Sequence, residues 1–156
     1  MSITNRAPGG GGSRIQIEVT NDPSRREVVL DAPVMDVWTV LPAVFADLDI
    51  EAPVQDIGSF QFGNPEFSPR RIEGRRLSSY LDCGAVAGGS RADRYQVVMQ
   101  FIVGLSGADE GTRIRTIVDA YASPRDVSGN AVHCLSRGTL EERLAELVLD
   151  RLAAVD

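Results

Sequence analysis

Two cysteines and one histidine are the side chains of this sequence best suited to covalent or metal chemistry. Cys83, Cys134 and His133 are the only residues of their types. Each cysteine comes at the end of a segment with a strand-like pattern, beside Gly84 in one case and Ser136 in the other. This matching position predicts a disulfide between them, and disulfides form in oxidising compartments. The alternative is two buried free thiols, because reduced cysteine packs as a small hydrophobic residue.

The same three residues do not predict a metal or nucleophile site. Structural zinc takes four ligands, commonly with C-x-x-C spacing, whereas Cys83, Cys134 and His133 supply at most three. The neighbours His133 and Cys134 would also point to opposite faces of a strand. A Cys–His nucleophilic pair needs a third, orienting group, and a disulfide would remove the thiol. We therefore expect no metal and no other cofactor, and interpret His133 as a surface or strand-edge residue.

The basic residues are concentrated in one stretch, which contains Arg70, Arg71, Arg75 and Arg76, with Arg91 and Arg94 following. Planar guanidinium forks bind carboxylates, phosphates and lipid head groups. The first four arginines are therefore candidates for anion binding. The alternative is a solvated strand face on which they pair with Glu73, Asp82 and Asp93.

Composition limits the possible functions. With 156 residues, 43% of them hydrophobic, the chain can form one domain with a substantial core. Its net charge of -6 argues against a surface that binds nucleic acid, because affinity for phosphate backbones needs a basic footprint. No apolar run approaches the roughly 18 residues of a membrane span, so we expect no transmembrane segment.

Residues 7–13 read APGGGGS, a composition that cannot bury apolar surface. We expect residues 1–13 to be a flexible Gly-rich tether and residues 14–156 to be a single α+β domain. The tether has two possible origins: an engineered linker, or a natural spacer behind a signal or lipid anchor in a longer precursor. A disulfide would place such a protein in the periplasm or outside the cell.

Residues 139–155 have the pattern of an amphipathic helix. Apolar residues recur there at spacings of three and four: Leu140, Leu144, Leu147, Val148, Leu152 and Val155. Charged residues, Glu141 and Glu142 among them, fill the other side. Thr139 followed by Glu142 predicts a capping box at the start of the helix. Such a stripe must cover a surface, which the strands upstream can supply.

Strand-like segments occupy residues 14–19, 27–32, 59–62, 71–82, 94–104, 112–121 and 130–135. Short turns between neighbours predict antiparallel pairing. A helix should begin at Pro33, since a proline in the first helical turn loses no hydrogen bond, and Pro42 should kink or split it. The predicted fold class is α+β: an antiparallel β-sheet with a kinked N-terminal helix and a long C-terminal helix packed on one face.

This order of elements resembles the helix-grip fold of START-like ligand-binding proteins. In the stretch VVLDAPVMDVWTVL, residues Ala32, Pro33, Val37 and Trp38 match the opening of that superfamily. The stretches LDCG and HCLSRGTLEERL are similar to uncharacterised cell-envelope proteins and lipoprotein domains. The resemblance implies a helix-grip domain in a protein of the cell envelope.

In such a domain, apolar residues line the space between the sheet and the last helix. The candidates for ligand contact are Trp38, Met99, Phe101, Leu144 and Val148. They either fill this space or enclose a pocket for an apolar ligand. Because no paired polar groups lie among them, a bound molecule is not expected to be transformed chemically.

Three functions are compatible with these patterns. The first is a non-catalytic binding or assembly module of the cell envelope, with a protein partner. The second is a carrier of a small apolar ligand or lipid, with a groove between the sheet and the C-terminal helix. The third is a small helix-grip enzyme, which a single histidine without an evident carboxylate partner makes the weakest of the three. We therefore expect a protein that is not an enzyme.

Overall fold

The structure is a computed structural model that describes residues 2–6, 14–19, 25–109, 111–125 and 129–154, with the backbone alone for 2–6, 14–19 and 25. The first half of the chain contains β1 (Ser2–Arg6), β2 (Arg14–Val19), β3 (Arg25–Leu30), α1 (Val34–Leu48), β4 (Val54–Asp56) and β5 (Gln61–Phe67). A series of short elements follows: β6 (Arg71–Ile72), β7 (Arg75–Arg76), the 3-10 helix η1 (Leu77–Ser79), β8 (Leu81–Asp82), β9 (Ala85–Val86), β10 (Gly89–Ser90) and α2 (Arg91–Arg94). The chain ends with β11 (Gln96–Ala108), β12 (Gly111–Ser123), β13 (Val132–Ser136) and α3 (Thr139–Ala154).

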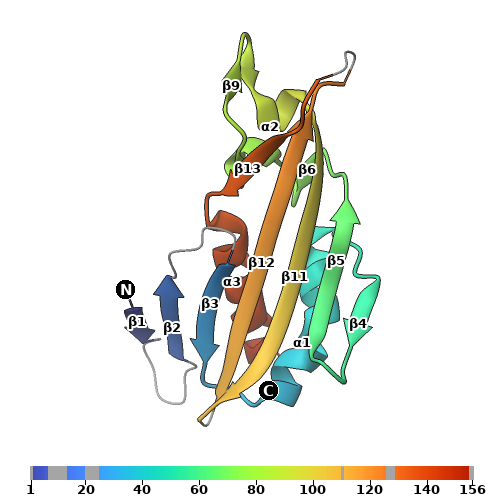
Figure 1. Cartoon of the computed structure of the whole chain (residues 1–156). Helices are drawn as coiled ribbons and strands as arrows, with labels where there is room; N and C mark the ends of the chain where they lie inside the picture. Colours follow the sequence, from blue (N-terminus) through green and yellow to red (C-terminus); the bar gives the residue numbers. More distant parts are fainter. Residues whose placement is uncertain (1, 7–13, 20–24, 110, 126–128, 155–156) are drawn as a thin grey trace.

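The long hairpin of β11 and β12 is the centre of an antiparallel sheet with the order β1-β2-β3-β12-β11-β5-β4 (Figure 1). One edge of β12 is shared by two strands, because β3 pairs with its first half and β13 with its second half. The period-two pattern of β12 has the predicted effect: Thr112, Ile114, Thr116, Val118 and Ala120 are buried, and the residues between them lie on the other face.

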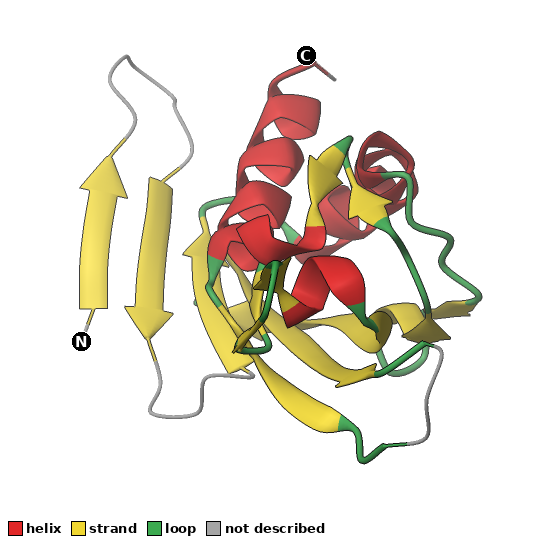
Figure 2. Ribbon diagram, turned by 90° about the horizontal axis from the view of Figure 1, so that it is seen from above, coloured by secondary structure: helices red, strands yellow, loops and turns green. Residues whose placement is uncertain are grey.

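Both long helices cover the same face of this sheet, and the opposite face has no helix over it among the described residues (Figure 2). Helix α1 packs against α3 as well as against the two central strands. This arrangement confirms the predicted α+β class with helices on one face. None of the described helices is long and apolar enough to cross a membrane.

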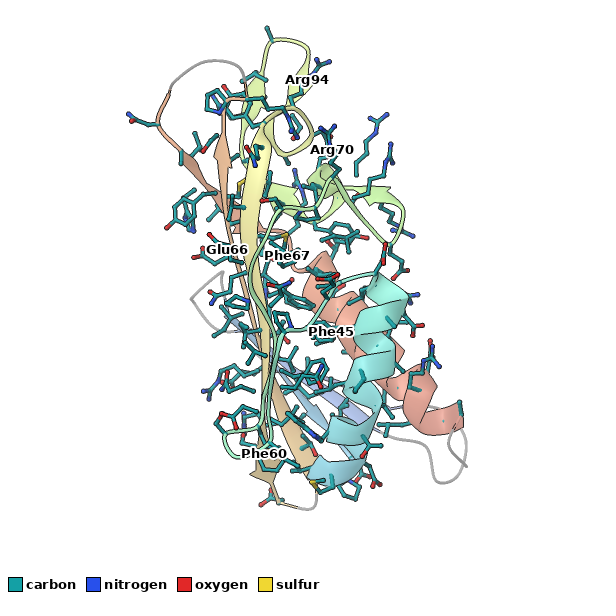
Figure 3. The ribbon with its side chains drawn as sticks, turned by 90° about the vertical axis from the view of Figure 1, so that its right-hand side faces the viewer. Phe45, Phe60, Glu66, Phe67, Arg70 and Arg94 are labelled. Atoms are coloured by element: carbon teal, nitrogen blue, oxygen red, sulfur yellow. A yellow bond between two sulfur atoms is a disulfide. The ribbon has the colours of Figure 1, made fainter. Side chains whose placement is uncertain are left out.

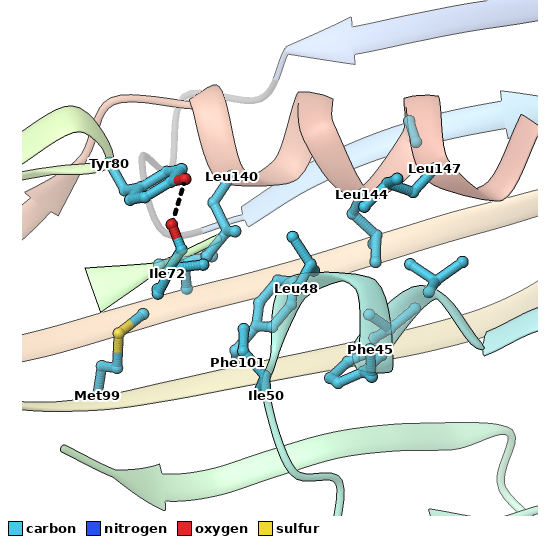
Figure 4. Close-up of a cluster of buried hydrophobic side chains, with 14 of the residues drawn as sticks. Phe45, Leu48, Ile50, Ile72, Tyr80, Met99, Phe101, Leu140, Leu144 and Leu147 are labelled. Carbon is cyan, nitrogen blue, oxygen red and sulfur yellow. Dashed lines mark hydrogen bonds between the residues drawn. The ribbon is translucent and has the colours of Figure 1, made fainter. Parts of the chain in front are cut away.

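Helices and sheet enclose one hydrophobic core (Figure 4). Phe45 of α1 stacks on Phe101 of β11 with ring centroids 5.3 Å apart, and it meets Phe62 of β5 edge-on at 4.9 Å. Leu140 and Leu144 of α3 are fully buried in the same cluster. The apolar stripe of α3 thus covers the sheet as its periodicity predicted.

Helix α1 runs through Pro42 without being split. Its buried residues lie on both sides of the proline and form one stripe: Val37, Val40, Leu41, Val44, Phe45 and Leu48. Pro42 itself is exposed. The prediction that Pro42 could split the helix is wrong, because packing of this stripe holds both halves on the sheet although one backbone hydrogen bond is lost.

The predicted capping box at the start of α3 is also wrong. The Thr139 hydroxyl donates to the carbonyl of Ser79 at 2.7 Å, and Glu142 is exposed. Glu141, which was expected on the solvent side, is buried, with only 3% of its surface exposed. Its carboxylate accepts hydrogen bonds of 2.7 and 2.9 Å from the Ser136 hydroxyl. The first turn of α3 therefore faces β13 and the short segments before α2, which local sequence does not reveal.

Residues 71–82 do not form the single strand that was predicted. They form β6, a tight turn, β7, η1 and β8. Glu73 and Gly74 both have positive φ angles, of 53° and 74°. Two successive residues of this kind make the two-residue turn typical of a tight hairpin, so the strand reverses where continuous alternation had been expected.

The N-terminal residues differ in part from the predicted tether. Residues 2–6 form β1, which pairs with β2, and β2 pairs with β3 as the expected hairpin. Backbone pairing with the edge of β2 requires no apolar side chains, so composition alone does not exclude it. Residues 7–13, which carry the Gly-rich run, lie outside the described residues.

Candidate anion-binding site

The turn at Glu73 and Gly74 fixes the register of the β6–β7 hairpin. Ile72 pairs with Arg75, and Arg71 therefore lies directly opposite Arg76. Like charges in directly opposed positions destabilise a strand pair. The hairpin is held in spite of this by buried Ile72, whose carbonyl accepts a 2.8 Å hydrogen bond from the Tyr80 hydroxyl (Figure 4). Arg71 and Arg76 are thus kept as direct cross-strand partners.

A pocket of about 210 Å³ lies beside this hairpin, lined by Arg70, Arg71, Arg76, Leu77, Ala92, Asp93 and Arg125. Buried Leu77 and Ala92 supply its apolar part, and the arginines are exposed around it. Figure 3 shows Arg70 toward one end of the molecule and Phe60 at the other. Four guanidinium groups and one carboxylate therefore meet at a concave surface of an acidic protein.

These four arginines have no ion-pair partner in the part of the chain that the structure describes. No carboxylate of the described residues lies within 4.0 Å of the guanidinium of Arg70, Arg71, Arg76 or Arg125. Some other arginines pair, as Arg143 does with Glu73 at 2.9 Å and Arg115 with Glu27 at 3.0 Å, whereas Arg75, Arg91, Arg94 and Arg137 also have no ion-pair partner among the described residues. The basic character of the pocket is therefore not neutralised by the described part of the protein.

The alternative interpretation of the arginine stretch required pairing with three carboxylates. Glu73 instead bonds Arg143 of α3. Asp82 accepts from the backbone N–H of Gly84, and Asp93 from that of Ser78, both at 3.0 Å. Glu73 and Asp82 are bonded to groups outside this set of arginines, and Asp93 forms no ion pair with the arginines although it lines the same pocket. The geometry therefore favours a surface that can receive an anion over a self-neutralised strand face.

Two of the four guanidinium groups are oriented by backbone carbonyls. Arg125 donates from Nε to the carbonyl of Arg94 and from Nη2 to that of Tyr95, each at 3.1 Å. Arg71 donates from Nη1 to the carbonyl of Gly74 at 3.3 Å. Each guanidinium has five N–H donors, so donors remain on both for a ligand. Prior orientation lowers the entropy lost when an anion binds.

The fourth arginine of the predicted set, Arg75, lies on the other side of the hairpin. It lines a second pocket of about 430 Å³ together with Glu73, Ser79, Tyr80, Thr139, Glu142, Arg143 and Glu146. Here charges of both signs alternate, and Arg143 bridges Glu73 and Glu146 at 2.9 and 3.2 Å. Burial, followed by the nearby charge of Glu73, raises the pKa of the Tyr80 phenol. In this second pocket Arg143 is paired, and the described lining has no excess of positive charge.

The predicted disulfide between Cys83 and Cys134 is present, with an S–S distance of 2.01 Å. It joins the segment after β8 to β13, which also pairs with β8. The carbonyl of Cys83 accepts a 3.4 Å hydrogen bond from Arg91 in α2. The bridge thus ties the short elements that carry the arginine pocket to the main sheet.

The residues proposed to contact an apolar ligand lie mainly in the closed core. Met99, Phe101, Leu144 and Val148 are each at most 2% exposed and belong to one packed cluster. Trp38 is half-buried at the edge of that cluster, edge-on to Phe60 and Phe62 at 5.6 Å. The two pockets described above are lined by other residues.

His133 has a carboxylate partner that the sequence did not indicate. On the sheet face without helices, its Nε2 lies 2.6 Å from Oδ1 of Asp119, and its ring lies 5.0 Å from that of Tyr121. Tyr121 is the direct cross-strand neighbour of His133, and Asp119 precedes it by two residues on the same face. This pair is exposed and lies outside both pockets. Among the described residues no group of three or more metal-ligating side chains is present.

Sequence reasoning found Arg70, Arg71 and Arg76 but missed Arg125, which follows Pro124 in a turn region with no local signal. It also treated Asp93 only as a partner for the arginines, although the structure brings it into the pocket. No protein-family profile matches the chain, and no curated protein compared with it matches either.

Proposed function

We propose that the protein is a non-catalytic binding module that works outside the cytoplasm and holds an anionic group of its partner in the arginine-lined pocket. The observation that carries this proposal is the convergence of Arg70, Arg71, Arg76 and Arg125 without carboxylate partners among the described residues. The direct opposition of Arg71 and Arg76 is unfavourable in the free protein. An anion between them would offset that repulsion.

The lining of the pocket favours binding over catalysis. Its described side chains are guanidinium groups, two apolar residues and the carboxylate of Asp93. It contains neither a histidine nor a thiol that could act as a nucleophile or general base near neutral pH. The disulfide supports a location in an oxidising compartment, which agrees with a protein of the cell envelope.

The alternative function, a carrier of an apolar ligand, has less support. Four of the five residues expected to line its groove are packed against one another in the core. Opening a ligand space there would require separation of α3 from the sheet, with loss of the contacts of Leu144 and Val148. The binding-module proposal requires no such rearrangement, because its pocket is already open.

Titration of the isotope-labelled protein with sodium phosphate and with sodium succinate, followed by NMR, tests the proposal. Binding of at least one anion should shift the backbone amides of Leu77, Ala92 and Asp93, and added salt should weaken it because the arginines are exposed. Arg76→Gln should weaken that binding about tenfold or more, the loss of one charge-assisted interaction. Arg75→Gln is the matched control, since it removes the same charge from the same hairpin on the side of the second pocket. No shift with either anion, or equal losses in the two variants, would contradict the proposal.

A further inference from the structure

The positive charge of the pocket exceeds what is needed to bind a single carboxylate. One guanidinium fork can pair with a carboxylate through two parallel hydrogen bonds, and four guanidinium groups line this pocket. Arg71 and Arg76 are direct cross-strand partners, whose Cβ atoms lie about 5 Å apart in such pairs. They can therefore approach one group from two sides. A phosphate monoester carries about -1.5 to -2 charges at pH 7 on three acceptor oxygens, which matches this arrangement better than one planar carboxylate.

Asp93 gives a second requirement for the ligand. A carboxylate beside four guanidinium groups repels a bare anion, yet it lines the same pocket. Its Oδ1 accepts from the backbone N–H of Ser78 at 3.0 Å, and Oδ2 has no hydrogen-bond donor among the described residues. A hydroxyl group of the ligand could donate to Oδ2. The residues thus favour a phosphate with a hydroxyl close to it.

The volume of the pocket limits the size of the ligand. The pocket measures about 210 Å³, and a cavity of roughly 150 Å³ accommodates a benzene molecule. The space therefore suits a phosphoryl group with part of one ring or a short polyol. A long chain or a duplex would have to remain largely outside.

From these three observations we infer that the arginine-lined pocket recognises the phosphate monoester of a sugar or other polyol, with the arginines on the phosphate and Asp93 on a neighbouring hydroxyl. This inference rests on the proposed function, because it names the chemistry of the anion held there. The shared chemistry occurs in soluble sugar phosphates and in phosphorylated lipid head groups.

Isothermal titration of the full chain with glucose 6-phosphate, inorganic phosphate and succinate tests the inference, in the wild type and in Asp93→Asn. Asparagine keeps an oxygen that can accept from Ser78, so folding should be retained and is checked by the melting temperature. The wild type should bind glucose 6-phosphate most tightly. Asp93→Asn should bind inorganic phosphate more tightly, because a repulsive charge is removed, while its preference for glucose 6-phosphate over phosphate falls about tenfold. These opposite changes are not expected from a merely structural role of Asp93.

The outcomes separate this inference from the proposed function. The inference is overturned if succinate or phosphate binds as tightly as glucose 6-phosphate, or if Asp93→Asn leaves the preference for glucose 6-phosphate over phosphate unchanged. In either case, anion binding that depends on Arg76 still supports the proposed function. Absence of Arg76-dependent binding of all three anions overturns both.

Vesicles of phosphatidylcholine, with and without phosphatidylinositol 4-phosphate, distinguish the two sources of the ligand. Co-sedimentation only with the phosphorylated lipid, lost in Arg76→Gln and kept in Arg75→Gln, supports the inference with a lipid head group as the source. Binding of glucose 6-phosphate without co-sedimentation supports it with a soluble ligand.

Discussion

Glu141 lies at the point where α3 meets the sheet, and its environment is set by residues distant in the chain. Burial raises the pKa of its carboxyl above the ordinary 4.5, and the Ser136 hydrogen bond only partly opposes this effect. The guanidinium of Arg26 in β3 lies 3.7 Å away, longer than a hydrogen bond. The charged form is therefore poorly solvated in the folded protein.

Glu141→Gln should remove a pH-dependent loss of stability. Above pH 4.5 the unfolded chain releases the Glu141 proton, whereas the folded chain retains it until the raised pKa is passed. Ionisation in this window favours unfolding, so the contribution of Glu141 to the free energy of unfolding falls as pH rises, and the decline levels off above the raised pKa. Urea denaturation at a series of pH values should show the stability of Glu141→Gln, relative to wild type, increasing through this window. A constant difference would mean that Glu141 does not titrate in this way.

A second residue-scale prediction concerns the buried phenol of Tyr80. Its hydroxyl supplies a donor to the Ile72 carbonyl at the base of the β6–β7 hairpin. Tyr80→Phe leaves that acceptor without this donor and should lower the free energy of unfolding by about 1–3 kcal/mol. Tyr121→Phe, at a tyrosine that is 48% exposed, is the control and should change it by less than about 0.5 kcal/mol. Equal effects of the two substitutions in urea denaturation would refute the assigned role of the Tyr80 hydroxyl.

At the scale of elements, α3 is held against the sheet by the apolar stripe that its sequence predicts. Leu144 has no exposed surface, whereas Asp150 on the same helix is exposed. Leu144→Ala should lower the free energy of unfolding by about 2–5 kcal/mol through lost burial and a cavity. Asp150→Ala should change it by less than about 0.5 kcal/mol. Chemical denaturation of both variants checks the assignment, and a silent Leu144→Ala would show that α3 does not close the core.

The disulfide connects the segment directly after β8 to β13, across a sequence separation of 51 residues. In the chain-entropy model, closing a loop of this size stabilises a protein by about 4 kcal/mol. Reduction, or the double substitution of Cys83 and Cys134 by serine, should therefore lower the denaturation midpoint markedly. Alkylation of the unfolded, unreduced protein should add no label, and prior reduction should allow both cysteines to react. Labelling without reduction would contradict the bridge and weaken the case for export.

At the scale of the whole molecule, the stabilising core lies between the helices and the central strands. Strand β1 is at the end of the sheet order and pairs with β2 alone, away from the helices (Figure 2). Deletion of residues 1–13 should therefore shift the melting temperature by less than about 4 °C, the equivalent of roughly 1 kcal/mol in a chain of this size. A larger drop in a thermal melt would mean that β1 contributes to the core.

Local periodicity was sufficient to predict most of the large elements. Alternation along residues 112–121 and the three-four spacing of Leu140, Leu144 and Leu147 are properties of near neighbours, and one buried face selects each pattern. The α+β class followed from the order of these segments. The disulfide was predicted from the position of both cysteines near the ends of strand-like segments, and in the structure Cys83 follows β8 while Cys134 lies within β13.

The sequence by itself therefore predicted the main strands, the C-terminal helix and a concentration of arginines, and it left open whether those arginines are paired. Only the tertiary structure showed which arginines share a pocket, because in the β6–β7 register Arg71 is paired with Arg76, while Arg75 is paired with Ile72 and lines the second pocket. It also brought in Arg125, and it engaged Glu73 and Asp93 with partners on other elements. Such contacts join residues far apart in the chain, so their geometry depends on how whole elements pack and not on the pattern of neighbouring residues.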